Sequence, residues 1–415
     1  MSTSLSLRTC LTLSAVASAV GLSFIPAPAQ AQEADLIKRI DAIQAEINAL
    51  RAQQAAAAAA PVTPAAKAPA AATGGVVAAS ATDGITISGK LDVALESNND
   101  GAVRRTALQS HKSAIDFAGQ RRLSDDLTGL VMLGTTITPD ATSGSFATRN
   151  SYVGLRSNRF GTILGGVYDD PIKQLQGTAA PVWGNADAME VIINGKANVS
   201  TVGATMRQYI TRNTNAVQYM SPKLGSFSGV VQYATDEVNG AAGTLRKPLF
   251  AVEMEYNDGN FNFGVASSSV KNFSAEGQDF EAFKLTAGMR WGQATLGLAY
   301  STFDNNAVNT TAKPTLHRST NNWMVAGTYR LGPVILKANY GVGGESYTGA
   351  MDGSKMLGLE VNYPLDRNTS LYSYYATISN DLNGLGNFTA GTNVYVIPVK
   401  GLDPHVFGVA VRYNY

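Results

Sequence analysis

The chain has 415 residues, of which 45% are hydrophobic, and its 32 basic and 31 acidic side chains give a formal net charge of +1. This balance predicts no nucleic-acid partner and no strongly acidic partner. The only cysteine is Cys10, and the three histidines (His111, His317 and His405) lack metal-ligand spacing, so the sequence predicts neither a metal site nor another cofactor.

Residues 1–31 have the features of a cleaved secretory signal peptide. Arg8 supplies a positive start, the apolar stretch runs from Leu11 to Ile25, and Ala29-Gln30-Ala31 fits a small-residue cleavage site. A membrane anchor is the alternative, but the apolar run is short and rich in serine. We therefore expect the chain to be exported.

Residues 32–54 predict a helix with a coiled-coil seam. Its apolar side chains are spaced alternately four and three residues apart, which places them at the a and d positions of heptads. They are Leu36, Ile40, Ile43, Ile47 and Leu50. A seam this short is marginal alone, so another oligomerising element must support it. An amphipathic helix lying on another surface is the alternative interpretation, and the seam does not decide between dimer and trimer.

Residues 55–83 are rich in alanine and proline. Pro61, Pro64 and Pro69 favour a semi-extended linker over a packed core. The mature chain is therefore expected to have three parts: a helix at 32–54, a linker at 55–83 and a large body at 84–415.

The body repeats a two-residue alternation of apolar and polar side chains. In GITISGKLDVALE, one face carries Ile85, Ile87 and Leu91, and the other carries Lys90 and Asp92. Many segments end in tyrosine, as in the aromatic girdles of outer-membrane barrels. Sixteen segments fit between residues 84 and 415, the second at 109–118, so we expect an all-β, sixteen-stranded antiparallel transmembrane β-barrel. A barrel of this size leaves an aqueous channel.

Several stretches, in the right order, resemble the general porins of Gram-negative outer membranes, particularly the trimeric sixteen-stranded porins of the neisserial type. They are ITISGKLDVALE, RNSYVGLRSNRFGTILGGVYDDP, RNTNAVQYMSPKLGSFSGVVQY, YPLDRNTSLYSYYA and GVAVRYNY. The resemblance implies a non-enzymatic outer-membrane porin that lets small hydrophilic solutes and ions diffuse passively. It also implies a homotrimer, surrounded by outer-membrane lipid, with the N-terminal helix in the periplasm.

In this family the third loop folds into the barrel, where its acidic groups face basic groups on the wall and narrow the pore. By position, the long connection after Asp169 corresponds to this loop. The constriction-loop residues that the resemblance implies are Asp169, Asp170, Asp187 and Glu190. The pore-wall residues are Lys90, Asp92, Asp116, Arg149, Arg156, Arg207 and Arg212.

The wall departs from the family pattern in ways that reduce its positive charge. SAIDFAG, from Ser113, places Asp116 and two alanines where the family usually has inward arginine or lysine. Gly166 and Gln218 stand where the family usually has arginine. We therefore expect a weakly selective or mildly cation-favouring pore.

The chain ends FGVAVRYNY, which is expected to pair with the first strand and close the barrel. The family also ends on an aromatic residue, which the outer-membrane assembly machinery is understood to recognise. The resemblance therefore assigns an assembly signal to Phe407, Tyr413 and Tyr415.

Three other functions stay open from the sequence. A channel specific for sugars or anions would need an aromatic track or a dense basic ladder, and Trp183 in the loop is a lone stacking surface. A tether to the cell wall through the N-terminal helix lacks a carbohydrate-binding motif. A barrel enzyme would need a nucleophile beside a base, and the sequence has no such motif.

Overall fold

The structure is a computed structural model of the whole chain. It describes residues 83–141, 145–194, 212–236, 246–273, 279–305, 319–345, 351–388 and 399–415, together with Ala45 and the backbone of 75–78. The predicted signal peptide, the coiled-coil seam, the linker before residue 75 and Arg207 lie outside the described residues. The chain divides into two compact units, Met1–Pro69 and Ala70–Tyr415, and the second holds the described sheet.

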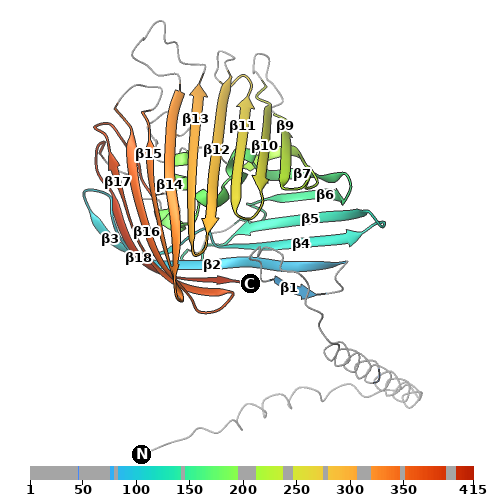
Figure 1. Cartoon of the computed structure of the whole chain (residues 1–415), viewed down its shortest axis with the longest axis horizontal. Coiled ribbons are helices and arrows are strands. Elements are labelled where there is room, and N and C mark those ends of the chain that lie inside the picture. The colour runs from blue at the N-terminus through green and yellow to red at the C-terminus, as the bar shows by residue number, and fades with distance from the viewer. Residues whose placement is uncertain are drawn as a thin grey trace, which may run out of the picture. The chain divides into compact units, whose positions relative to one another are not determined.

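The second unit is an antiparallel sheet whose strands follow one another in chain order until the last pairs with the first (Figure 1). The strands are β2 (Gly84–Asn99), β3 (Arg104–Ser110), β4 (Ala114–Arg122), β5 (Leu127–Thr136), β6 (Ser151–Ser157), β7 (Gly161–Asp169), β8 (Arg212–Met220), β9 (Phe227–Ala234), β10 (Leu249–Asn257), β11 (Phe261–Val270), β12 (Phe280–Trp291), β13 (Ala294–Asn305), β14 (Ser319–Leu331), β15 (Val334–Gly343), β16 (Ser354–Pro364), β17 (Thr369–Asn380) and β18 (His405–Asn414). Since β3 and β4 both pair with β2 and together form one interrupted strand, the closed barrel has sixteen strands, as predicted.

The interruption of the second strand corrects the expected span of 109–118. The backbone leaves the strand at His111, passes through Lys112 with a φ of 55°, and returns at Ala114. Two hydrogen bonds hold the break against β2: the His111 amide donates to the Asp92 carbonyl (2.9 Å), and the Asp92 amide donates to Ser113 Oγ (2.9 Å). The break therefore keeps the barrel closed while turning two side chains, His111 and Lys112, out of the regular alternation.

A further short strand, β1 (Gly75–Ala78), lies within the segment expected to be a linker. It pairs antiparallel with the beginning of β2, from Gly75 opposite Ser88 to Ala78 opposite Ile85. The closing strand β18 covers β2 only as far as Lys90. Hence β1 continues on the edge of β2 that the closing strand leaves bare, and unpaired edges are what a barrel must avoid.

The two faces of the barrel differ as the alternation predicts. On β2, Leu91 and Leu95 point outward and are exposed, whereas Asp92 and Glu96 point inward and are buried. Outward tyrosines gather where strands meet short turns, at Tyr219, Tyr329 and Tyr363. Among the described residues, no helix is long and apolar enough to cross a membrane.

Candidate functional site

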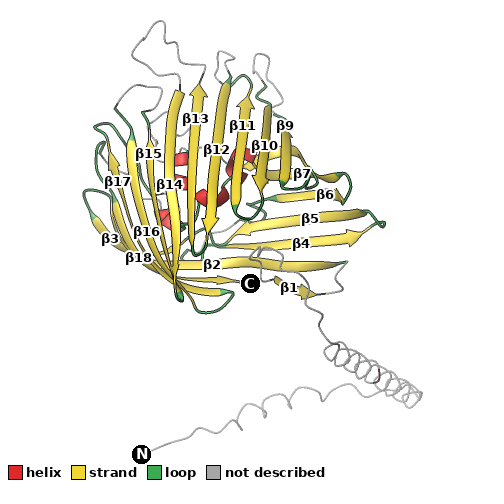
Figure 2. Cartoon of the chain, in the orientation of Figure 1, coloured by secondary structure: helices red, strands yellow, loops and turns green. Residues whose placement is uncertain are grey.

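The connection between β7 and β8 folds into the barrel, as expected for the third loop. Its described part, residues 170–194, contains α2 (Pro171–Gln174), the 3-10 turns η1 (Gly177–Ala179) and η2 (Gly184–Ala186), and the π-helical turn η3 (Met189–Ile193). These short helices lie inside the sheet and pack mainly against β9–β17 (Figure 2). The described part of the loop therefore occupies one side of the lumen.

Apolar packing fixes the loop to this side of the wall. Met189, Val191, Ile192 and Ile193 are almost completely buried and join inward residues of the barrel in one cluster. The wall beneath the loop carries glycines, and a Cβ on Gly297 would lie 2.6 Å from the Ala179 backbone. These positions lack side chains because the loop backbone occupies the space.

Hydrogen bonds from the wall satisfy the loop backbone. Lys284, buried on β12, donates from Nζ to the Ile172 carbonyl (3.1 Å) and to Asn194 Oδ1 (3.2 Å), so it joins the two ends of the described loop. Ser301 Oγ donates to the Ile193 carbonyl (2.6 Å). Because buried backbone groups are costly to leave unpaired, these contacts hold the loop as a fixed part of the wall.

Asp170 serves as an anchor of the loop. Its carboxylate accepts hydrogen bonds from the Ile172 amide (2.9 Å), Asn213 Nδ2 (3.0 Å) and Ser268 Oγ (3.1 Å), which caps α2 and ties it to β8 and β11. The side chain is completely buried. Burial raises the pKa of Asp170 to about 6, against the opposing effect of these hydrogen bonds.

The two acids near the tip of the loop have different surroundings. Asp187 is buried and accepts a hydrogen bond from the Met189 amide (3.0 Å). Burial raises the pKa of Asp187 to about 6, although the neighbouring Lys112 opposes the rise. Glu190 forms an ion pair with Lys112, with Oε1 and Nζ 3.2 Å apart. The charges of both acids are thus largely hidden or matched.

Asp169 lies at the end of β7, where the loop begins, and is surrounded by cations. Its Oδ1 is 2.6 Å from Lys173 Nζ and 3.3 Å from Arg212 Nε. Asn150 completes this group, since its Nδ2 donates to Asp169 Oδ2 (3.1 Å) and its Oδ1 accepts from Arg212 (3.1 Å). Two cations therefore share one carboxylate.

Three cations surround the ring of Trp183 from the loop. Lys90 Nζ lies 3.3 Å from the centre of the ring, and Lys112 Nζ and the Arg412 guanidinium carbon each lie 5.1 Å away. These distances are those of cation–π contacts. Trp183 therefore holds positive charge in the narrow part of the lumen and does not present an open face.

The remaining predicted wall residues are divided between the narrow region and the barrel end. Asp116 Oδ1 and Arg149 Cβ both lie within 3 Å of the point where a Cβ on Gly134 would stand, so the two residues adjoin over that glycine. Arg156 lies near the short turn between β6 and β7, where it is exposed and donates to Gln120 Oε1 (3.1 Å). The structure therefore brings Lys90, Asp116, Arg149 and Arg212 to one side of the lumen, and leaves Arg156 at the end.

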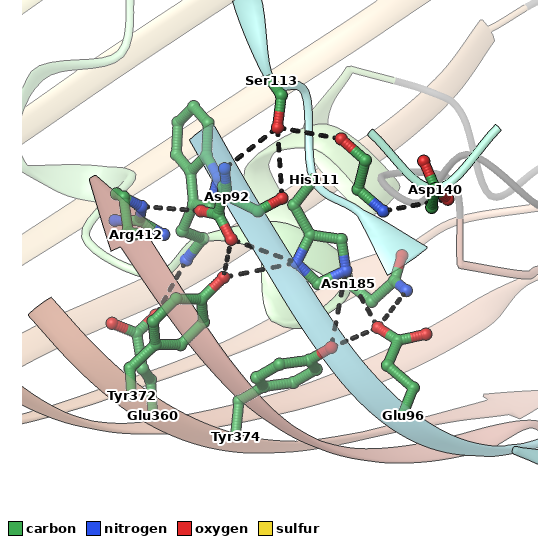
Figure 3. A network of polar contacts seen from close by, with 12 residues as sticks. Asp92, Glu96, His111, Ser113, Asp140, Asn185, Glu360, Tyr372, Tyr374 and Arg412 are labelled. Atoms are coloured by element: carbon green, nitrogen blue, oxygen red, sulfur yellow. Dashed lines mark hydrogen bonds and ion pairs between the residues drawn. The ribbon is translucent and has the colours of Figure 1, made fainter. Parts of the chain in front are cut away.

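A buried polar network joins the loop to the strand break and the closing seam (Figure 3). Glu96 accepts hydrogen bonds from Asn185 Nδ2 of the loop (2.8 Å) and from the Tyr374 hydroxyl, and lies 2.9 Å from His111 Nε2. Asp92 accepts from the Tyr372 hydroxyl (2.5 Å) and from Arg412 Nε (2.6 Å).

Asp92, predicted as a wall residue, is therefore completely buried in this network. Sequence reasoning missed Glu96, His111, Tyr372 and Tyr374. The signal for the tyrosines was present, since Tyr372 and Tyr374 are two residues apart on one strand and share the inward face.

The end of the chain closes the seam. The Tyr415 backbone exchanges two hydrogen bonds with Gly89 (3.0 and 3.1 Å), and its hydroxyl donates weakly to the Ala114 carbonyl (3.4 Å). A Cβ on Gly89 would lie 2.9 Å from that hydroxyl. Phe407 and Tyr413 point outward from β18 and are exposed. Tyr415 thus crosses β2 and contacts β4 just after the strand break.

Comparison with protein families gives one family model, described as Gram-negative porin, that matches residues 55–383. The major outer membrane protein P.IB of Neisseria lactamica is 25% identical over 252 residues, covering 58% of this chain and 68% of that protein. A protein of the same name from Neisseria gonorrhoeae is 27% identical over 191 residues, covering 44% and 51%.

Solved structures with the same fold include an anion-selective porin from Comamonas acidovorans. It is 20% identical, has a TM-score of 0.68, and the match covers 80% of this chain and all (100%) of that one. The trimer form of OmpT from Vibrio cholerae is 17% identical with a TM-score of 0.60, covering 80% and 100%. OmpF of Salmonella typhi, in complex with daunomycin, is 16% identical with a TM-score of 0.57, covering 80% and 98%.

Proposed function

This chain belongs to the Gram-negative porin family, and on that premise we propose that its channel favours small anions. The protein is an integral outer-membrane porin that forms a water-filled channel for passive diffusion of small hydrophilic solutes. The preference for anions is the part that the charges of the narrow region support.

One observation carries this preference: Lys90 and Arg149 flank the loop without an ion-pair partner within 4 Å among the described residues. Apart from Asp116, three acids nearby are engaged. Glu190 is paired with Lys112, Asp92 with Arg412, and Asp169 is shared by two cations. Unmatched positive charge in a narrow pore attracts anions and repels cations.

This proposal replaces the weak or cation-favouring selectivity expected from the sequence. That expectation rested on basic positions missing from β4, β7 and β8. The structure adds Lys112, Lys173 and Arg412 to the same region, from the strand break, the loop and the closing strand. Asp116 remains as one acid among these cations.

A sugar-specific channel is less well supported. The loop tryptophan that the sequence offered as a stacking surface for sugars is covered, because Lys90 lies directly against the ring of Trp183. The cell-wall tether and the coiled-coil seam depend on residues 32–54, of which the structure describes Ala45. Tethering therefore remains a hypothesis from the sequence.

We also propose that the working form is a homotrimer. The neisserial resemblance supports it, and a related fold has been solved in a trimer form. In barrels of this class short turns face the periplasm and long loops face outward. By this rule the chain end at Tyr415 lies on the periplasmic side, where assembly factors would reach it.

The experiment is a reversal-potential measurement on the purified protein in a planar bilayer, under a tenfold KCl gradient. We expect the sign of an anion-selective channel. The double variant Lys90→Gln/Arg149→Gln should move the potential toward zero. Lys223→Gln is the matched control, because it removes a charge from an exposed short turn. A wild-type potential of cation-selective sign would contradict the proposal.

A further inference from the structure

We propose that the lumen wall of β4–β7 binds small organic anions that have an apolar or aromatic body, such as aromatic monocarboxylates. This inference rests on the proposed anion preference and names the class of anion. The site combines the cations of the narrow region with an adjoining strip of apolar side chains, here called the inner apolar strip. The strip comprises Ala118, Leu130, Met132, Tyr152 and Tyr168.

The strand register places these residues side by side. Ala118 on β4 is directly opposite Met132 on β5, which is opposite Tyr152 on β6. Their chain neighbours Val131 and Val153 are exposed on the outer face. Since side chains alternate between the faces of a strand, Met132 and Tyr152 point into the lumen.

The two tyrosines form the aromatic end of the strip. Tyr152 and Tyr168 come from adjacent strands, and their ring centres are 5.3 Å apart with an angle of 52° between the planes. Both are half-buried, and neither hydroxyl forms a hydrogen bond with another described residue. By contrast, the hydroxyls of Tyr372 and Tyr374 are engaged with buried carboxylates. Tyr152 and Tyr168 therefore keep partly open surface toward the lumen.

The described part of the third loop, residues 170–194, does not account for this apolar surface. Apolar lumen residues beneath the loop are explained by its packing, but the described helices of the loop pack mainly against β9–β17. The strip lies on β4–β7. A polar, water-filled lumen is the rule for channels of this size, so a cluster of apolar side chains in contact with it calls for a ligand.

Cations lie beside the strip, at the end nearest Ala118 and Tyr168. Asp116, two residues before Ala118 on the same inward face, neighbours Arg149 over Gly134. Arg212 begins β8 and is opposite Asp169, the residue that follows Tyr168. A carboxylate held by Arg149 and Arg212 would place an attached ring over Tyr152 and Met132. Guanidinium groups bind carboxylates in two-pronged geometry, and aromatic rings stack or meet edge to face.

The test compares benzoate with acetate as blockers of KCl current through single channels of the full-length protein. Both carry one carboxylate, but only benzoate has a body that covers the strip. We expect half-block by benzoate at a concentration about fivefold lower than by acetate, the size of one aromatic contact. Tyr152→Phe should keep this difference, and Tyr152→Ala should abolish it.

Two further variants guard against a misfolded barrel. Met132→Gln should reduce the benzoate preference without removing a ring, and the outward Val153→Ala should leave it unchanged. Equal block by benzoate and acetate, in a wild-type channel that keeps its anion-selective reversal potential, would overturn the proposed binding at the strip. It would leave the proposed anion preference standing. Unchanged benzoate preference in both Tyr152→Ala and Met132→Gln would also overturn it. A cation-selective potential would overturn both this inference and the proposed preference.

Discussion

The ammonium group of Lys112 lies 3.2 Å from a carboxylate oxygen of Glu190, so the break in the second barrel strand is tied directly to the third loop. Lys112 reaches the loop because its backbone adopts a positive φ of 55° and leaves the alternation of the strand. The pair is partly exposed, with 22% of the lysine side chain accessible, so it tunes the charge of the channel more than the stability of the barrel.

Removing the acid of this pair and removing the lysine should shift the ion selectivity of the channel in opposite directions. Glu190→Gln leaves Lys112 unmatched and should move the reversal potential further toward anions. Lys112→Gln leaves Glu190 unmatched and should move it toward cations. The measurement is the reversal potential of each variant under one KCl gradient. A shift of the same sign in both variants would show that the pair does not act through charge.

Acidification should strengthen anion preference through Asp187. Burial raises the pKa of Asp187 to about 6 from an ordinary value of 3.8, so its negative charge is lost as the pH falls from 7 to 5. We expect the reversal potential to move toward anions over this range. The Asp187→Asn variant carries no charge at any pH, so it should show a smaller shift. A full shift in the variant would assign the titration to another group.

The raised pKa of Asp187 also predicts that the stability of the barrel depends on pH. Because the folded-state pKa lies above the unfolded one, the charged form of Asp187 is penalised in the barrel, and the penalty disappears as pH falls through about 6 toward 4. Asp187→Asn should therefore be more stable than wild type at pH 7, by on the order of 2–3 kcal/mol, and equal to it near pH 4. Urea-unfolding midpoints of both proteins at the two pH values measure this.

A side chain at Gly358 should lift the loop from the wall. A Cβ there would collide with the Ala186 carbonyl of η2 and would lie 2.7 Å from Asn339 Oδ1. The same Asn339 side chain donates a hydrogen bond from Nδ2 to the Ala186 carbonyl. We expect Gly358→Val to lower single-channel conductance and to raise current noise, because a loop pushed off the wall moves into the lumen and is held less firmly. Gly165→Ala is the control, since a Cβ at that position meets nothing within 4 Å. Wild-type conductance in Gly358→Val would argue against close loop docking.

Much of the barrel could be predicted because alternation is a local property. The outward face of β2, with Leu91 and Leu95, can be recognised from the alternation of apolar and polar residues along the strand. This alternation is required because one face of the strand meets lipid and the other meets water. The strand break was not predictable in the same way. The turn at Lys112 uses a lysine with positive φ where a glycine would have been the usual signal.

The narrow region was harder to predict because its contacts join distant parts of the chain. Arg412 and Asp92 are 320 residues apart in sequence but 2.6 Å apart in space, and the Arg412 guanidinium carbon lies 5.1 Å from the centre of the Trp183 ring. Asp170 lies at the start of the loop, and sequence alone could not reveal that Asn213 and Ser268 enclose it. Burial of an acid depends on what closes over it, which only the folded barrel defines.

The ring of Tyr415 should matter more to assembly than its hydroxyl. The ring crosses the outer face of β2 at Gly89, whereas the hydroxyl makes a long hydrogen bond of 3.4 Å to the Ala114 carbonyl. We expect Tyr415→Ala to reduce the yield of heat-modifiable barrel several-fold, and Tyr415→Phe to assemble nearly as wild type. The hydrogen bond is worth at most about 1 kcal/mol, too little to decide closure.

A second substitution separates the packing of the seam from recognition by the assembly machinery. Gly89→Val leaves the end of the chain unchanged, but its Cβ would lie 2.9 Å from the Tyr415 hydroxyl and would collide with the Ala114 carbonyl oxygen, so it is compared with the double variant Gly89→Val/Tyr415→Ala. If packing at the seam is what the ring supplies, Tyr415→Ala should impair unassisted refolding into detergent, and its effect should be smaller when Gly89→Val is already present. If Tyr415→Ala refolds normally there and fails only in cells, the ring acts as a signal read by assembly factors, and the contact with β2 is incidental.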